Sequence, residues 1–297
     1  MIVRKKLFKG LKDMNKFTAL YADMIKTWEG HSAQYLNGVV STLSLAFVAT
    51  VIGCIIGLVC GILQTIPYSK KDNPFKKAVL WLIRIIIRIY VEVFRGTPMV
   101  LQAMFVYFAI PYFTNNTVRL DVIPTAYLVV SINTGAYMAE TVRGGILSID
   151  PGQTEGAKAI GMNHLQTMLY VILPQTIKNI IPQIGNNLII NIKDTSVMFI
   201  IGYTELFAAH KAIVGAKYVY FPSSVITMIL YLALTVIASI ILRWWEDLMD
   251  GPDNFDVATT DTLALTSGTY NYRGDKKKKK REKQQIDANT EREEKNE

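Results

Sequence analysis

Long blocks of apolar residues, free or nearly free of charge, alternate with short polar or basic segments along this chain. A block of about 18 or more such residues is long enough to cross a membrane as a helix. A helix is also suited to lipid because it satisfies its own backbone hydrogen bonds. The pattern therefore predicts an all-α, polytopic membrane protein, in agreement with a chain of 297 residues that is 51% hydrophobic.

The apolar blocks predict about five transmembrane helices, at residues 38–66, 97–112, 123–147, 184–206 and 221–242. The last block ends at Trp244 and Trp245, an aromatic pair typical of a membrane–water interface. The first contains Gly53, Gly57 and Gly61, which share one helix face because they recur every fourth residue. Small residues at this spacing allow close helix approach in lipid. We expect a packing seam there, either within the chain or against a second subunit.

Residues 78–94 are apolar but contain Arg84, Arg88 and Glu92, which form one charged stripe on a helix. An arginine at the bilayer centre costs about 2.5–3.5 kcal/mol. Only residues 95–97 separate this stretch from the next block, too few for a comfortable reversal through lipid. We therefore expect a cytoplasmic or interfacial helix that leads into the next span, with Arg95 extending to the cytoplasmic edge.

Three regions differ in composition. Residues 1–37 form a basic N-terminal arm, residues 38–248 a transmembrane domain, and residues 249–297 a polar, low-complexity tail. The arm has no apolar region directly behind its basic front, so we see no cleavable signal peptide; an interfacial helix and a disordered arm both remain open. The tail is expected to be disordered and cytoplasmic.

The distribution of lysine and arginine predicts the orientation. The loop at residues 68–95, the segment at 143–178 and the tail are rich in these residues and are assigned to the cytoplasm. Five spans then place the N-terminus outside. The N-terminal arm is basic too, but most of its charge lies more than 20 residues before the first span, where the rule is weak.

The segment after the third predicted span contains two helix-start signals and a glycine corner. Asp150 is a typical N-cap, with Gln153 at the capping-box position. Gly161 is a typical helix end, and Asn163 with Gln166 repeats the capping pattern. We expect two short helices that meet at this glycine on the cytoplasmic side.

The same segment, residues 150–175, contains a spaced motif made of Glu155, Gly156, Ala157, Gly161, Val171, Ile172, Leu173 and Pro174. It resembles the coupling loop of ABC importer permeases, which reads Glu-Ala-Ala, three residues, Gly, nine residues, Ile-x-Leu-Pro. The spacing matches throughout. Gly156 and Val171 depart from the pattern, and both changes are mild.

Three further stretches are similar to polar amino-acid permeases of the His/Gln/Glu/Arg/opine type. They are residues 94–98 (FRGTP), 135–146 (GAYMAETVRGGI) and 193–196 (KDTS), and the resemblance covers about residues 38–243. It implies a type I ABC importer permease fold in a bacterial inner (plasma) membrane. It also implies inward transport of a polar amino acid by alternating access.

The resemblance implies partners as well. These are two ATP-binding-cassette ATPase subunits, a second permease copy or homologue, and an extracytoplasmic substrate-binding protein. ATPase coupling is assigned to Glu155, Gly156, Ala157, Gly161, Leu173 and Pro174. Whether the permease pair is identical or mixed stays open.

The chain has no G-x-x-x-x-G-K-[ST] phosphate loop, so any ATP must bind to another chain. We expect no enzymatic activity, catalytic residue, metal or cofactor in this chain. The chain is expected to lie in the lipid bilayer, and nucleic acid is not an expected partner. His164 and His210 have no metal-ligand neighbours in the sequence and are interpreted as surface residues.

Polar residues within the predicted spans are candidates for the substrate pathway, because such groups usually face a cavity or a partner. Glu140, near Asn133 and Tyr137, is suited to bind a cationic group of an amino acid, or else to pair with Arg143. The fourth span adds Asn187, Asn191, Asp194, Thr195 and Ser196. These residues either line the pathway or bind the helices together, and both readings remain open.

Two other functions agree less well with the sequence. A stand-alone channel or ion-driven carrier for small polar solutes would need no ATPase, but the sequence has no evident inverted repeat. A membrane-embedded enzyme would need a cluster of catalytic or metal-binding side chains, which the sequence lacks. The ABC permease interpretation is therefore the preferred one.

Overall fold

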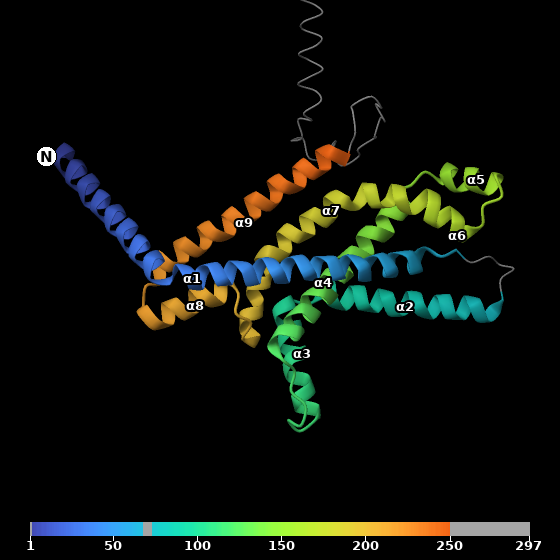
Figure 1. Ribbon diagram of the computed structural model, residues 1–297, viewed down its shortest axis with the longest axis horizontal. Helices are drawn as coiled ribbons and strands as arrows, with labels where there is room; N and C mark the ends of the chain where they lie inside the picture. Colours follow the sequence, from blue (N-terminus) through green and yellow to red (C-terminus); the bar gives the residue numbers. More distant parts are fainter. Residues whose placement is uncertain (1, 68–72, 250–297) are drawn as a thin grey trace, which may run out of the picture. The chain divides into compact units, whose positions relative to one another are not determined.

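A computed structural model describes residues 2–67 and 73–249, and every regular element in these ranges is a helix (Figure 1). In chain order the elements are α1 (Ile2–Thr65), α2 (Pro74–Gly96), α3 (Met99–Phe113), α4 (Val122–Leu147), α5 (Pro151–Ala159), α6 (His164–Thr167), a π-helical turn (Met168–Ile172), α7 (Leu173–Asp194), a 3-10 turn (Thr195–Ile201), α8 (Leu206–Lys217) and α9 (Tyr220–Met249). The all-α prediction is confirmed. The predicted tail after residue 249 lies outside the described residues.

Three helical segments in the described ranges are long and apolar enough to cross a membrane. They are Lys16–Thr65, which lies in α1, the whole of α4, and Tyr220–Glu246, which lies in α9. A fourth span is formed if His164–Ile201 and α8, which meet at an angle of 50°, are one broken span. The remaining predicted span corresponds to α3, whose 15 residues are fewer than the roughly 20 that a bilayer requires. Length and composition thus support three or four spans, where the sequence predicted about five.

The glycine seam of α1 packs against α4 of the same chain. A Cβ atom at Gly57 would lie 2.3 Å from the Cβ of Met138 and 2.7 Å from its carbonyl carbon. Gly53 and Gly61 approach α4 equally closely, at Thr134 and Val142. The predicted seam is confirmed, and its partner is an internal helix.

α2 lies beside α1 and α4 and runs antiparallel to α1 (Figure 1). The Tyr90 hydroxyl donates to the carbonyl oxygen of Ile132 in the middle of α4, at 2.6 Å. This bond joins the second half of α2 to a helix that is long and apolar enough to cross a membrane, and the expectation that α2 is a cytoplasmic or interfacial helix stays a prediction. The charge is tolerated because Arg95 pairs with Glu140 of α4.

Residues 24–39 of α1 pack against α8 and α9. The helix runs without a break through residue 37, and Tyr35 is fully buried, with its hydroxyl 2.6 Å from the Ser223 hydroxyl of α9. His210 of α8 joins them, its Nδ1 lying 2.8 Å from the same hydroxyl. His210 is buried, so the surface interpretation is wrong for it, whereas His164 is exposed as expected.

Candidate transport cavity and coupling helices

A cavity of about 460 Å³ lies where the α2–α3 joint meets α4 and α7. Its lining combines polar and apolar groups and consists of Arg95, Gly96, Thr97, Pro98, Met99, Asn133, Thr134, Tyr137, Asn187, Ile190, Asn191 and Asp194. Five of the eight predicted pathway residues are among them: Asn133, Tyr137, Asn187, Asn191 and Asp194.

Two side-chain amides fix the joint between α2 and α3. The buried Gln102 donates through Nε2 to the carbonyl oxygens of Phe94 and Thr97, and to the Thr97 hydroxyl, each at 2.9 Å. Asn133 of α4 donates to the Phe94 carbonyl oxygen and to Gln102 Oε1, both at 3.0 Å. The last carbonyl groups of a helix have no partner within it, and here the amides satisfy them. The position of Arg95 is therefore held from both neighbouring helices.

Arg95 connects the cavity to a charged pocket beside it. Its guanidinium forms an ion pair with Glu140 and lies 5.3 Å from the centroid of the Tyr137 ring, a cation–π distance. Glu140 lines the neighbouring pocket, so its predicted place in the pathway is indirect. The alternative pair of Glu140 with Arg143 does not form among the described residues, and the extension of Arg95 to the cytoplasmic edge stays a prediction. The FRGTP motif at residues 94–98 is the sequence feature that marks this part of the cavity.

The buried Asn191 both lines the cavity and binds helices together. Its Nδ2 donates to the Thr50 hydroxyl at 2.8 Å and to the Thr134 hydroxyl at 3.0 Å, which joins α7 to α1 and α4. Asn187, one turn earlier, donates to the backbone carbonyl oxygen of Gln183 at 2.9 Å. Asn191 thus binds helices together, and its place in a substrate pathway stays a prediction.

The three remaining candidate pathway residues, Asp194, Thr195 and Ser196, lie at or just after the end of α7 and differ in whether they line the cavity. Asp194 is exposed and lines the cavity. Thr195 is fully buried, and its hydroxyl donates to the Ile192 carbonyl oxygen at 3.2 Å. Neither Thr195 nor Ser196 lines the cavity. The lining thus offers one guanidinium, one carboxylate and three amides, a set that can hold a ligand bearing both a negative and a positive group. No group of three or more side chains suited to a metal ion occurs among the described residues.

The two short helices after α4 meet at Gly161, as predicted. Gly161 has φ +85°, and the amide of Met162 donates to the Ala157 carbonyl oxygen at 3.0 Å, which closes a Schellman motif. Asn163 and Gln166 form the predicted capping box of α6, with both hydrogen bonds at 2.9 Å. The glycine corner therefore fixes the angle between α5 and α6.

The start of α5 differs from the prediction in one detail. Asp150 caps the helix by accepting from the Gly152 amide at 2.7 Å. Gln153 does not complete a capping box, because its Oε1 accepts a bond from Gln175 Nε2 at 3.3 Å. This bond joins α5 to α7.

The predicted coupling residues divide between two places. Glu155 and Gly156 are exposed on α5, and a Cβ at Gly156 would have no neighbour within 4 Å. Ala157 faces inward and is buried. Leu173 is buried in a core with the end of α4, and Pro174 begins α7 beside it. Glu155 and Gly156 thus present a surface on α5, Gly161 and Pro174 are exposed as well, and Leu173 anchors the segment that carries them.

Comparison with known proteins decides the family. The profile of the family "Binding-protein-dependent transport system inner membrane component" matches residues 78–250. The chain belongs to this family. It is the permease subunit of an ABC importer, an inner-membrane component with the fold of type I importer permeases.

Individual relatives agree. The glutamine transport system permease protein GlnP of Escherichia coli K12 is 35% identical over 214 residues, which covers 72% of this chain and 92% of GlnP. The arginine transport system permease protein ArtQ of Bacillus subtilis is 34% identical, covering 69% of this chain and 88% of ArtQ. A crystal structure of an amino acid ABC transporter with histidines superposes with a TM-score of 0.65 at 31% identity, over 76% of this chain and 97% of that one.

Proposed function

We propose that this permease moves a polar amino acid inward by alternating access. The observation that carries the proposal is that Arg95 and Asp194, of opposite charge, both line one cavity of about 460 Å³. A free amino acid carries a carboxylate and an ammonium group, and these two side chains have the complementary charges. The relatives GlnP and ArtQ, named for glutamine and arginine transport, support the same class of cargo.

The residues take separate roles in this proposal. Arg95 binds the substrate carboxylate, with Glu140 as its counter-ion when the cavity is empty. Asp194 receives the ammonium group, and the amides of Asn133, Asn187 and Asn191 line the space between them. Hydrogen bonds between ionised partners are shorter and stronger than those between neutral groups.

Energy comes from partner chains. Two ATP-binding-cassette ATPase subunits bind and hydrolyse ATP, and each receives one α5 helix through the exposed Glu155–Gly156 surface. This chain itself binds no cofactor and catalyses no reaction. A second permease, identical or homologous, completes the pathway, and an extracytoplasmic protein delivers the substrate.

The proposed orientation has the N-terminus outside and the C-terminus in the cytoplasm. It is supported by Figure 1, in which α1 begins at the end of the helices opposite α5. If α5 meets an ATPase in the cytoplasm, the start of α1 lies on the other side.

Transport by the complete, co-purified complex in proteoliposomes tests this function. We expect ATP-dependent uptake of at least one member of a panel of labelled amino acids. Arg95→Gln and Asp194→Asn should each raise the half-saturating concentration about 10–100-fold, since a hydrogen bond to a charged group contributes about 1.5–3 kcal/mol. Arg119→Gln, in the exposed loop after α3, is the control and should behave as wild type. Uptake driven by an ion gradient without an ATPase would instead establish a carrier.

A further inference from the structure

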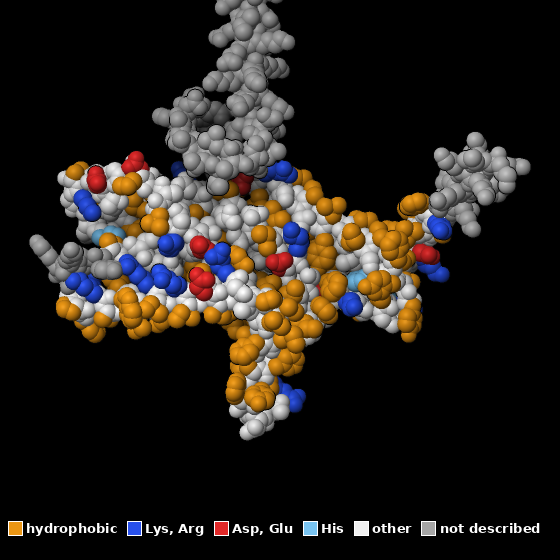
Figure 2. All heavy atoms as spheres, turned by 180° about the vertical axis from the view of Figure 1, so that it is seen from behind, with side chains coloured by type: hydrophobic (Ala, Val, Ile, Leu, Met, Phe, Trp, Pro, Cys, Tyr) orange, Lys and Arg blue, Asp and Glu red, His pale blue; other side chains and the backbone are white. Residues whose placement is uncertain are grey.

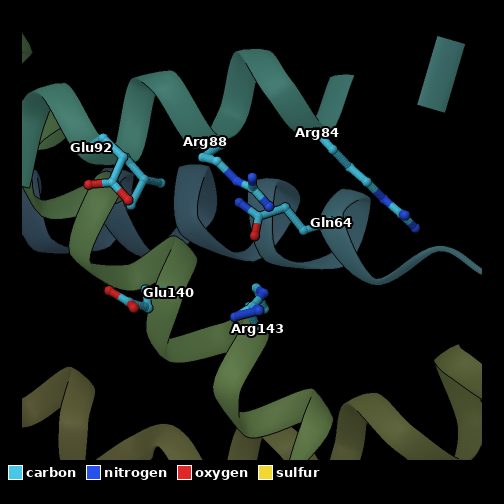
Figure 3. A pocket seen from close by; sticks show the side chains of 7 residues that line it. Gln64, Arg84, Arg88, Glu92, Glu140 and Arg143 are labelled. Atoms are coloured by element: carbon cyan, nitrogen blue, oxygen red, sulfur yellow. The ribbon is translucent and has the colours of Figure 1, made fainter. Parts of the chain in front are cut away.

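A second pocket, of about 380 Å³, lies between α1, α2 and α4 and contains three arginines (Figure 3). Its lining is Gln64, Arg84, Arg88, Val91, Glu92, Glu140 and Arg143. Arg88, Gln64 and Arg143 point toward one another across it, whereas the Glu140 carboxylate points away from Arg143 (Figure 3). The transport proposal makes no use of these arginines.

The charge of this pocket is not balanced within the described part of the chain. Glu140 is already paired with Arg95, and the Arg84 guanidinium is engaged with the Ile66 carbonyl oxygen, so Glu92 is the one remaining carboxylate of the lining beside Arg88 and Arg143. Among the described residues, neither Arg88 nor Arg143 has a hydrogen bond or an ion pair. Unpaired arginines beside an apolar phase are costly, so an external anion would stabilise the arrangement.

The pocket lies near the C-terminal ends of α1 and α4, and α4 leads directly to α5. Gln64 is the penultimate residue of α1, and the Arg84 guanidinium donates to the carbonyl oxygen of Ile66, just beyond that helix. Arg143 is four residues, or about 6 Å, before the end of α4 at Leu147. A site one turn from the ends of membrane-crossing helices is at the depth of lipid headgroups.

The outer surface of α2 suits lipid. Leu82, Ile86, Ile89 and Val93 form an exposed apolar stripe, and Trp81, one turn before Arg84, is 62% exposed. Figure 2 shows a row of basic side chains along this helix next to a row of apolar ones. Acyl chains fit the apolar row, while a headgroup would reach the arginines.

We propose that Arg88 and Arg143, with Gln64, bind a phosphate group at the membrane interface, supplied by an anionic phospholipid. Guanidinium groups bind phosphate through paired N–H bonds, and Gln64 adds a neutral donor. An occupied site ties the end of α1 to α2 and α4, directly before the segment that leads to α5.

Native mass spectrometry of the complex tests the site without substrate or ATP, so its outcome is independent of transport. The complex is released from bilayers of equal parts phosphatidylglycerol and phosphatidylcholine, and retained lipids are counted. Wild type should retain phosphatidylglycerol preferentially. Arg88→Gln with Arg143→Gln should weaken retention about 25-fold, since each arginine near the surface contributes roughly fivefold.

The control is Arg119→Gln with Arg243→Gln, which removes the same charge from exposed positions elsewhere, and it should retain lipid as wild type does. If the glutamine pair does not fold, Arg88→Lys with Arg143→Lys keeps the charge and should give an intermediate loss, because paired bonding is lost. Equal retention of the two lipids by wild type, or equal losses in test and control pairs, overturns the proposal.

A second arm identifies the source of the phosphate. The complex in pure phosphatidylcholine is titrated with inorganic phosphate while its melting temperature is followed. A rise that depends on Arg88 and Arg143 would assign the site to soluble phosphate. No rise, together with arginine-dependent retention of phosphatidylglycerol, assigns it to lipid.

Discussion

Replacing Gly57 by alanine should force α1 and α4 apart, and the structure sets the size of the effect. The new Cβ would lie 2.3 Å from Met138 Cβ, 2.7 Å from its carbonyl carbon and 2.9 Å from the Ala139 amide nitrogen, where ordinary contact begins at 3.4 Å. Two of these atoms are backbone, so a side-chain rotation does not relieve the overlap. Overpacking of this kind typically costs about 1–3 kcal/mol.

Gly144→Ala is the matched control, because it lies in a helix and a Cβ there has no neighbour within 4 Å. Both substitutions gain about 0.5–1 kcal/mol of helix propensity, so their difference isolates the overlap. We expect Gly57→Ala to melt several degrees below Gly144→Ala, at about 2–4 °C per kcal/mol.

This difference in melting temperature is measured by thermal unfolding of the detergent-purified chain. The signal is the fraction of protein that remains monodisperse on size-exclusion chromatography. Equal melting temperatures for the two variants would refute the close α1–α4 contact.

Three other substitutions test the cavity and the coupling corner. Asn191→Leu should destabilise the chain by about 1–3 kcal/mol in the same assay, because two buried threonine hydroxyls lose their shared partner; an unchanged melting temperature would contradict this role. Gly161→Ala should cost about 1–2 kcal/mol locally, because φ is +85° there, and should lower the transport obtained per ATP hydrolysed, whereas Gly156→Ala should not strain the backbone. Glu140→Gln removes the counter-ion of Arg95 and should reduce uptake at least tenfold in proteoliposomes, so normal uptake would exclude that pair from transport.

Features that depend on residues close together in the sequence were predictable. The glycines at every fourth residue of α1 indicated a seam because helix geometry alone places them on one face. The capping box at Asn163 and the corner at Gly161 depend on bonds within a few residues, and both form. The resemblance added what local rules lack, namely the family and its coupling loop.

Features that depend on distant partners were not predictable. The ion pair of Arg95 is one such feature, because its partner, Glu140, is 45 residues later in the sequence and on another helix. His210 lacked neighbours in sequence for the same reason, and its partner Ser223 lies on the next helix. The glycine seam of α1 shows the same limit. The spacing of the glycines identified one face of α1, but it did not identify α4 as the helix that packs against this face.

The most direct test of the account is site-specific cross-linking from α5. Glu155→Cys is made in a background without Cys54 and Cys60, and the complex is purified from its native membrane. We predict that the thiol cross-links to a nucleotide-binding subunit and is labelled by a membrane-impermeant reagent only from the cytoplasmic side. Lys217→Cys, at the end of α8, is the control and should be labelled only from outside. Labelling of residue 155 from outside, or the absence of any nucleotide-binding subunit in its cross-links, would contradict the account.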